Sequence, residues 1–314
     1  MSGRISIIGG AGRVGSNAAY ALQLAGIGDE IVLVDAADEA ARGEALDLTH
    51  GRAVVGGPRF IAGGYDSVAG SDVVIVTAGL RRKPDESRLE LIERNAALFR
   101  EIVRSVCAVD LPSDAILLVV TNPVDILTYI AATEFDWPAD RTIGLGTMLD
   151  TLRFRSLLGE ELNLNPELIE GLILGEHGDS MVPIFSNLHY DGKALSDVAG
   201  DSTDAEQRAF ARTRSAGAEC ISLKGGAGYA VGLAIRTVVH ALIEDSHAVL
   251  PVSTVQDRGE FEGVAFSLPT RIGRAGRIEH SPTKLSQDEY RALVRSAEVL
   301  RTSISQLRNR GASA

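Results

Sequence analysis

Three short segments of the sequence carry polar side chains that the packing of a core would not require. At 175–180, Gly-Glu-His-Gly-Asp-Ser sets a histidine, which can exchange protons near neutral pH, among small and acidic residues. At 149–155, Leu-Asp-Thr-Leu-Arg-Phe-Arg places Asp150 and Arg153 three residues apart, on one side of a helix. Thr-Asn-Pro-Val-Asp at 121–125 follows an apolar run. Together these groups could transfer a proton beside a bound anion, although a histidine on its own is more often structural.

A fourth segment, Ala-Gly-Leu-Arg-Arg-Lys-Pro-Asp-Glu-Ser-Arg at 78–88, combines a glycine, a proline and a basic cluster. This composition predicts a mobile loop, and a solvated run of charges is the alternative interpretation. The loop follows an expected strand, so it faces the carboxyl edge of a sheet, where ligand sites of α/β proteins form.

A glycine motif near the N-terminus predicts a dinucleotide site. Gly10, Gly12 and Gly15 form a G-x-G-x-x-G that follows an expected strand and opens a helix, and Asp35 lies about 20 residues further on. The glycines allow a tight turn and close approach of a pyrophosphate to the helix N-terminus. Asp35 would bind the adenosine ribose hydroxyls and repel a 2′-phosphate, which favours NAD over NADP. A glycine turn without a nucleotide is the alternative.

Alternating strand and helix patterns position these segments. Short apolar runs predict strands in the first half at 4–8, 30–34, 59–62, 73–77 and 116–120, with helices at 14–25, 39–50 and 88–109. Such βα repeats predict a doubly wound parallel sheet of the Rossmann type, an α/β fold, over residues 1–147. The second half, 148–314, predicts an α+β substrate and catalytic domain. Its expected helices are 204–224, 227–245 and 287–310, and its expected strands are 248–255, 263–271 and 277–279.

Composition excludes several classes of protein. The 314 residues include 31 Lys and Arg against 42 Asp and Glu, a net charge of −11, which is unlike a nucleic-acid-binding protein. No basic block favours an anionic membrane surface, and no apolar run approaches the roughly 18 residues that span a bilayer. Two cysteines far apart in the sequence predict reduced thiols, and the N-terminus contains no apolar run typical of a signal peptide. We therefore expect a cytoplasmic protein.

Over nearly its whole length, the chain resembles the 2-hydroxy-acid dehydrogenase family of lactate and malate dehydrogenases. The glycine motif, T-N-P-V-D, L-D-x-x-R-F-R and G-E-H-G-D occur in the order and approximate spacing of that family. The resemblance implies a catalytic pair of His177 and Asp150 and NAD as the cofactor. It also implies that Arg153 binds the substrate carboxylate, that Arg88 is the catalytic arginine of the mobile loop, and that Asn122 lies beside the nicotinamide and the substrate.

These residue types suit the implied reaction. Imidazole can take the hydroxyl proton as a hydride leaves C2, and a carboxylate behind it fixes the tautomer and stabilises the imidazolium. One guanidinium can bind the substrate carboxylate with two parallel hydrogen bonds, and a second can polarise the C2 oxygen when the loop closes. No Cys/His cluster has convincing metal-binding spacing, so no metal is expected.

Within the resembling family, the position before Lys-Pro separates the substrates, and Arg82 occupies it here. An arginine there pairs with the second carboxylate of oxaloacetate, whereas a glutamine suits the methyl group of pyruvate. Lys-Gly-Gly-Ala at 224–227 has alanine where lactate enzymes often carry threonine. The expectation is therefore a malate dehydrogenase, with an L-lactate or another 2-hydroxy-acid dehydrogenase as the alternative. Two features depart from the usual malate pattern: Pro-Asp-Glu at 84–86 replaces the usual Pro-Gly, and Gly-Thr-Met-Leu-Asp at 146–150 is closer to the lactate-like branch of the family. Because that branch also contains malate enzymes, the chain most resembles a malate dehydrogenase of the lactate-like branch.

A noncatalytic NAD-binding sensor is a more remote alternative. Such a protein would need only the glycine motif and Asp35, whereas this chain also has His177, Asp150, Arg153 and Arg88, which a sensor would have no reason to keep together. An NAD-dependent glycosidase would need a metal cluster. As partners we expect a small dicarboxylate substrate, no nucleic acid and no membrane. The apolar helix faces at 14–25 and 227–242 are candidates for burial against partner subunits. The resemblance implies a homodimer or homotetramer, and the lactate-like branch favours the tetramer.

Overall fold

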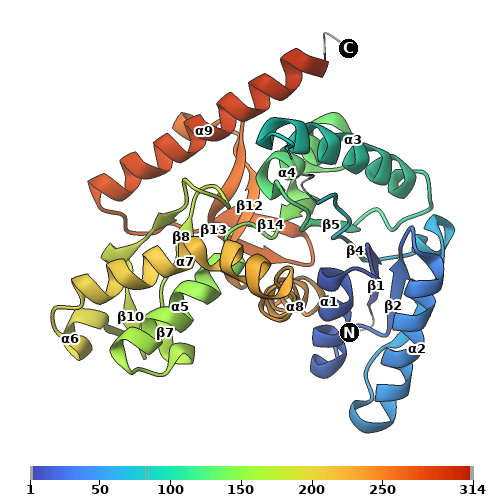
Figure 1. Ribbon diagram of the computed structural model, residues 1–314, viewed down its shortest axis with the longest axis horizontal. Coiled ribbons are helices and arrows are strands. Elements are labelled where there is room, and N and C mark those ends of the chain that lie inside the picture. The colour runs from blue at the N-terminus through green and yellow to red at the C-terminus, as the bar shows by residue number, and fades with distance from the viewer. Residues whose placement is uncertain (1–2, 82, 84, 312–314) are drawn as a thin grey trace.

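The structure is a computed structural model that describes residues 3–81, 83 and 85–311. Figure 1 shows a central sheet with helices on both of its faces. Within the described residues the main sheet has nine strands, in the order β14-β13-β12-β6-β5-β4-β1-β2-β3. The expected α/β fold class is confirmed.

The first six strands are parallel and follow the doubly wound order 3-2-1-4-5-6. They are β1 (Arg4–Ile8), β2 (Glu30–Val34), β3 (Arg59–Ala62), β4 (Val73–Val76), β5 (Ile116–Val119) and β6 (Thr142–Gly144). The helices between them are α1 (Arg13–Ala25), α2 (Asp38–Val55), α3 (Arg88–Cys107) and α4 (Val124–Glu134). Since parallel strands end at one edge of the sheet, the loops after β1, β4 and β5 lie at that edge together.

The second half of the chain extends the same sheet. Its strands β12 (Val249–Val255), β13 (Ala265–Gly273) and β14 (Gly276–His280) are antiparallel, and Ser253 of β12 pairs with Gly144 of β6. One sheet thus runs across the domain boundary expected near residue 147, and the boundary itself stays a proposal.

The remaining elements surround this extension. The helices are α5 (Met148–Leu162), α6 (Leu195–Ala199), α7 (Thr203–Lys224), α8 (Tyr229–Ile243) and α9 (Gln287–Gly311). The short strands β8 (Ile173–Leu174) and β9 (Val182–Pro183) pair with each other, and β7 (Ile169–Glu170), β10 (His189–Tyr190) and β11 (Lys193–Ala194) form a third small sheet. Single 3₁₀ turns occupy Tyr65–Val68, Ala139–Arg141, Pro166–Leu168, Phe185–Asn187 and Gly259–Phe261.

Two large apolar cores lie on the two faces of the main sheet. One packs α3, α4 and α9 against alternate residues of β4 and β5, such as Val76 and Leu117. The other packs α1, α2 and α8 against the opposite residues, such as Ile75 and Leu118. This burial on both faces explains why the parallel strands read as continuous apolar runs in the sequence. Among the described residues, no helix is both long enough and apolar enough to cross a membrane.

Candidate active site

The turn after β1 has the geometry of a phosphate-binding loop. Gly12 caps α1, and no side chain caps the N-terminus of that helix by a hydrogen bond. A Cβ at Gly10 would lie 2.8 Å from Cβ of Leu33, and a Cβ at Gly15 would collide with the carbonyl oxygen of Gly9. Glycine therefore keeps this turn narrow, so that the N–H groups of the helix can bind a phosphate.

Gly9 is a further glycine that this turn requires and that the sequence motif did not include. Its φ is 89°, and a Cβ there would lie 2.6 Å from the backbone nitrogen of Ala78. The turn thus packs directly against the start of the loop that follows β4. The double glycine, Gly9-Gly10, was the available signal in the sequence.

Asp35 lies just after β2, with its carboxylate held beside the glycine loop. Its Oδ2 accepts a hydrogen bond from the N–H of Ala11 at 3.1 Å, and its Oδ1 accepts one from the N–H of Ala37 at 3.0 Å. An acidic residue at the end of this strand is placed to bind ribose hydroxyls. The glycine loop and Asp35 together fit the pyrophosphate and adenosine ribose of NAD.

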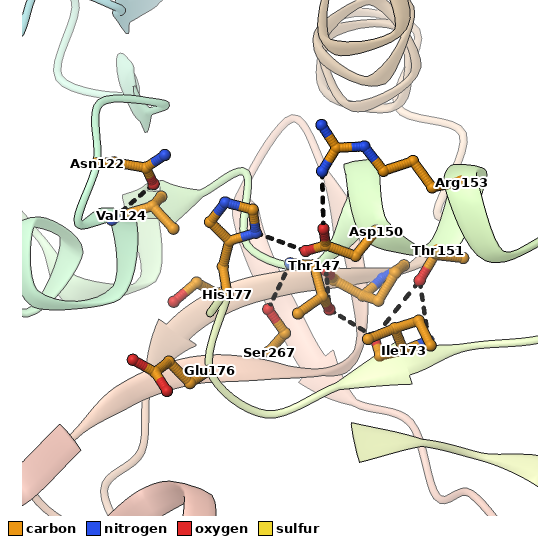
Figure 2. Close-up of polar contacts among 12 residues, drawn as sticks. Asn122, Val124, Thr147, Asp150, Thr151, Arg153, Ile173, Glu176, His177 and Ser267 are labelled. Carbon is orange, nitrogen blue, oxygen red and sulfur yellow. Dashed lines mark hydrogen bonds and ion pairs between the residues drawn. The ribbon is translucent and has the colours of Figure 1, made fainter. Parts of the chain in front are cut away.

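The structure brings His177, Asp150 and Arg153 together, as Figure 2 shows. Nδ1 of His177 lies 2.5 Å from Oδ2 of Asp150, and Nη1 of Arg153 donates to Oδ1 of the same carboxylate at 3.1 Å. The Asp150 side chain is 1% exposed, whereas those of His177 and Arg153 are 20% and 15% exposed. A buried carboxylate thus orients an imidazole and a guanidinium, both of which remain accessible.

Hydrogen bonds between α5 and β8 set this geometry. The hydroxyl of Thr147 donates to the carbonyl oxygen of Ile173 at 2.5 Å, and the N–H of Ile173 donates to Oγ1 of Thr151 at 3.0 Å. The N–H of Thr147 donates to Oγ of Ser267 at 2.9 Å. The first two contacts fasten the N-terminal turn of α5, which carries Asp150, to β8, the strand that leads to His177. The third fastens the same turn to β13. The sequence analysis missed them, because nothing local identifies their partners.

The charges in this cluster shift the pKa values of both members of the pair. Burial raises the pKa of Asp150, but the positive charges of His177 and Arg153 outweigh it, so this pKa lies below its usual value. Burial lowers the pKa of His177, but Asp150, with a smaller contribution from Asp125, outweighs it and raises the pKa to about 9. The imidazole is therefore protonated at neutral pH when no substrate is bound.

Arg88, the first residue of α3, reaches the segment that carries His177. Its Nη2 lies 3.2 Å from Oε1 of Glu176, and its Nη1 lies 3.3 Å from Oδ2 of Asp179. The Arg88 side chain is 63% exposed. The arginine expected to act on the substrate thus lies beside the histidine segment, paired with its acidic residues. Arg82 lies outside the described residues.

Acidic and hydroxyl groups anchor the second part of the loop before α3. Oε1 of Glu86 lies 2.5 Å from Nη1 of Arg94, and Oε2 accepts the N–H of Lys83 at 2.9 Å. Ser87 caps α3 in a capping box with Glu90. The helix that presents Arg88 therefore begins at a well-fixed point.

Asn122 follows β5, and its Oδ1 accepts a hydrogen bond from the N–H of Val124 at 3.4 Å. The Asn122–Pro123 peptide bond is cis. In the view of Figure 2, Asn122 and Arg153 lie to either side of the His177 ring. Asn122 is thus on the side of the site that comes from the first half of the chain.

The turn between α7 and α8, which includes Ala227, is tied to the glycine loop. Nη1 of Arg13 donates to the carbonyl oxygens of Lys224 at 2.7 Å and Gly226 at 3.3 Å. Arg13 is the first residue of α1, so this turn lies close to the expected cofactor. In the described part of the chain, no group of three His, Cys, Asp or Glu side chains could hold a metal ion.

Comparisons with known proteins cover both halves of the chain. The model of the lactate/malate dehydrogenase NAD-binding domain matches residues 3–144, and that of the family's alpha/beta C-terminal domain matches residues 147–310. An L-lactate dehydrogenase of Thermoanaerobacter sp. (strain X514) is 40% identical over 97% of this chain and 99% of its own. One of Salinibacter ruber is 41% identical over 95% of this chain and 96% of its own.

The fold is also similar to solved structures. The minor L-lactate dehydrogenase of Enterococcus mundtii, crystallised in a ligands-bound form, superimposes with a TM-score of 0.91 at 33% identity. That similarity covers 97% of this chain and 98% of the other.

Proposed function

The chain belongs to the lactate/malate dehydrogenase family and is an NAD-dependent 2-hydroxyacid dehydrogenase, and from this premise we propose that it interconverts L-lactate and pyruvate. The observation that supports this substrate pair best is the similarity to L-lactate dehydrogenases over nearly the whole chain. The sequence-based prediction put malate first and lactate as the alternative. The relatives favour that alternative.

His177 exchanges the proton in this proposal. In pyruvate reduction the imidazolium donates its proton to the C2 oxygen, and in lactate oxidation the neutral ring takes the proton back. Asp150 holds Nδ1, so Nε2 is the nitrogen left to meet the substrate. When bound, the cofactor would supply a hydride as NADH in the reduction and would accept one as NAD in the oxidation.

The two arginines orient the substrate and stabilise charge. Arg153 uses one N–H on Asp150, and a guanidinium carries five donors, so the substrate carboxylate can bind to the others. The exposed side chain of Arg88, at the fixed start of α3, leaves Glu176 and Asp179 for the C2 oxygen when the loop before α3 closes over the substrate. Asn122 supports the nicotinamide and substrate from the opposite side.

Malate and oxaloacetate are the second candidate pair, favoured by Arg82. Burying an unpaired guanidinium against the methyl group of pyruvate costs several kcal/mol, and a second substrate carboxylate recovers that cost. A difference of about 4 kcal/mol corresponds to roughly a thousandfold in kcat/KM. Ala227, which lies where lactate enzymes often have threonine, agrees with this candidate.

One assay decides between the pairs. The loss of NADH absorbance is followed with the purified protein and either pyruvate or oxaloacetate, and kcat/KM is compared. A larger value for pyruvate supports the lactate proposal, and a larger value for oxaloacetate supports the malate candidate. The His177→Asn variant is the control for background oxidation. No turnover of either substrate, with NADH bound, would contradict both candidates and favour the sensor.

The proposed enzyme is cytoplasmic and a homo-oligomer, a dimer or a tetramer. Large apolar side chains are exposed on the helices of one face: Tyr20 and Leu24 of α1, and Tyr229 and Leu233 of α8, are each more than half exposed. Such a concentration of apolar side chains is typical of a subunit interface. Light scattering of the purified protein measures the mass, and a monomer would contradict this part of the proposal.

A further inference from the structure

Asp125 ends the Thr-Asn-Pro-Val-Asp segment and has no role in the mechanism above. It lies in the first turn of α4 and is only 2% exposed. Each of its oxygens accepts one hydrogen bond: Oδ2 from the backbone N–H of His177 at 2.7 Å, and Oδ1 from the hydroxyl of Ser253 at 2.6 Å. A residue of the first half of the chain thus holds two segments of the second half.

The hydrogen bonds alone would not require a charge at this position. An asparagine could accept the N–H of His177 with its carbonyl oxygen and donate its amide to Oγ of Ser253, because a hydroxyl both donates and accepts. An amide would also avoid the cost of burying an ionised carboxylate. That an aspartate rather than an asparagine occupies position 125 therefore indicates a role for its negative charge beyond its two hydrogen bonds.

The groups around Asp125 show where that charge acts. Glu176 and His177 face it from the segment after β8, and Asp150 and Arg153 of α5 act on the same imidazole. Burial raises the pKa of Asp125 to about 7, against the opposing effects of Ser253 and His177. Above neutral pH Asp125 is thus mainly ionised, and its charge favours the protonated form of His177.

We propose that Asp125 is a positioning residue for proton transfer, which fastens the main chain of His177 and places a second negative charge, besides that of Asp150, near the imidazolium. The inference rests on the proposed role of His177 as the proton donor. Asn122 lies three residues before Asp125 in the same segment. In this proposal, residues 121–125 therefore both contact the nicotinamide, through Asn122, and position the proton donor, through Asp125.

The test is the pH profile of Asp125→Asn, which keeps both hydrogen bonds and removes the charge. We expect unchanged NADH affinity, measured by fluorescence, and an alkaline limb of kcat/KM for substrate reduction that shifts to lower pH by about one unit. Above that limb the variant should be about tenfold slower than the native enzyme, since one pKa unit is a tenfold change. A native profile in a folded variant would overturn the proposal.

Thr128→Val is the matched control. Thr128 lies one turn further along α4, is 0% exposed, and uses its hydroxyl only on the carbonyl oxygen of Val124 among the contacts described. We expect its pH profile to be native. An equal shift in both variants would mean that packing rather than charge moves the profile, and would overturn the proposal.

A second measurement does not depend on turnover. In protein with isotope-labelled histidine, NMR follows the titration of the His177 ring, assigned with His177→Asn, and Asp125→Asn should titrate at lower pH than the native protein. If Asp125→Asn does not fold, Ser253→Ala replaces it. Loss of the hydrogen bond from Ser253 raises the pKa of Asp125, so Asp125 is less ionised. The titration of His177 should then move to lower pH by a smaller amount. If His177 titrates at the same pH in Asp125→Asn as in the native protein, the inference is overturned. If instead the native protein turns over neither pyruvate nor oxaloacetate, the proposed function is contradicted.

Discussion

Nδ1 of His177 lies 2.5 Å from Oδ2 of Asp150, and the carboxylate is almost completely buried. The contact fixes the orientation of the ring and leaves Nε2 as the nitrogen that can reach a substrate. It also stabilises the protonated ring, because the two charges interact away from water.

His177→Asn should abolish turnover and leave NADH binding nearly unchanged, since the glycine loop is untouched. A positioned proton donor typically accelerates a reaction by about 10²–10⁴-fold, so kcat should fall by at least about 10²-fold. Steady-state kinetics and NADH fluorescence measure the two effects. Asp150→Asn should cost less, because the ring remains and only its charged partner is lost. A His177 variant with more than about a tenth of native activity would show that another group transfers the proton.

The two directions of the reaction should respond oppositely to pH. The pKa of His177 is raised to about 9, so the imidazolium persists at neutral pH and is lost as the pH rises through that value. Reduction uses the protonated ring, and its kcat/KM should fall above about pH 9, whereas oxidation of the hydroxy acid should increase through the same interval. Buffered assays in both directions provide the measurement. Identical profiles in the two directions would be incompatible with this assignment.

Asp35 should determine the preference for NAD(H) over NADP(H). Asp35→Ala removes the carboxylate and its hydrogen bond to Ala11, so NADH binding should weaken by about tenfold, or ~1.4 kcal/mol, and discrimination against NADPH should relax. Asp38→Ala, at an exposed position in the first turn of α2, is the control and should change neither value. Equal kcat/KM for both cofactors in the native enzyme would refute the prediction.

Arg82→Gln should shift specificity toward pyruvate, whichever substrate the native enzyme prefers. Loss of one desolvated charge pair should lower kcat/KM for oxaloacetate by on the order of 10²–10³, while pyruvate no longer meets a buried charge. The ratio of the two constants is the measurement, and Arg81→Gln, at an exposed position, is the control. An unchanged ratio would mean that Arg82 does not contact the substrate, and a shift only in the Arg81 variant would reassign the role.

Gly15→Ala and Gly43→Ala should have opposite effects on stability, although both glycines lie in helices. A Cβ at Gly15 would meet the carbonyl oxygen of Gly9, so the main chain must move, and we expect a loss of about 1–3 kcal/mol and weaker NADH binding. A Cβ at Gly43 has no neighbour within 4 Å, and alanine there should add about 0.5–1 kcal/mol. Urea unfolding at one protein concentration measures both changes. Equal effects would mean that the glycine loop is not closely packed.

The parallel half of the fold followed from local patterns in the sequence, and those patterns also singled out the polar segments that carry the predicted site residues. Strands β1, β2 and β3 have the predicted bounds, because each is a short, mostly apolar run that starts at a charged residue and is followed by glycine or aspartate. The spacing of Asp150 and Arg153 placed them on one face of a helix, where they form an ion pair. Resemblance to a family, rather than spacing, joined His177 to this pair.

The tertiary structure decided the contacts between distant segments. The antiparallel extension of the main sheet depends on the pairing of Ser253 with Gly144, and no pattern in either segment specifies that pairing. Asp125 reads as an ordinary acid at the start of a helix, yet its partners His177 and Ser253 lie 52 and 128 residues away. Periodicity reports which face of an element is buried, but the partner of a buried polar group is set only when packing closes the chain around it.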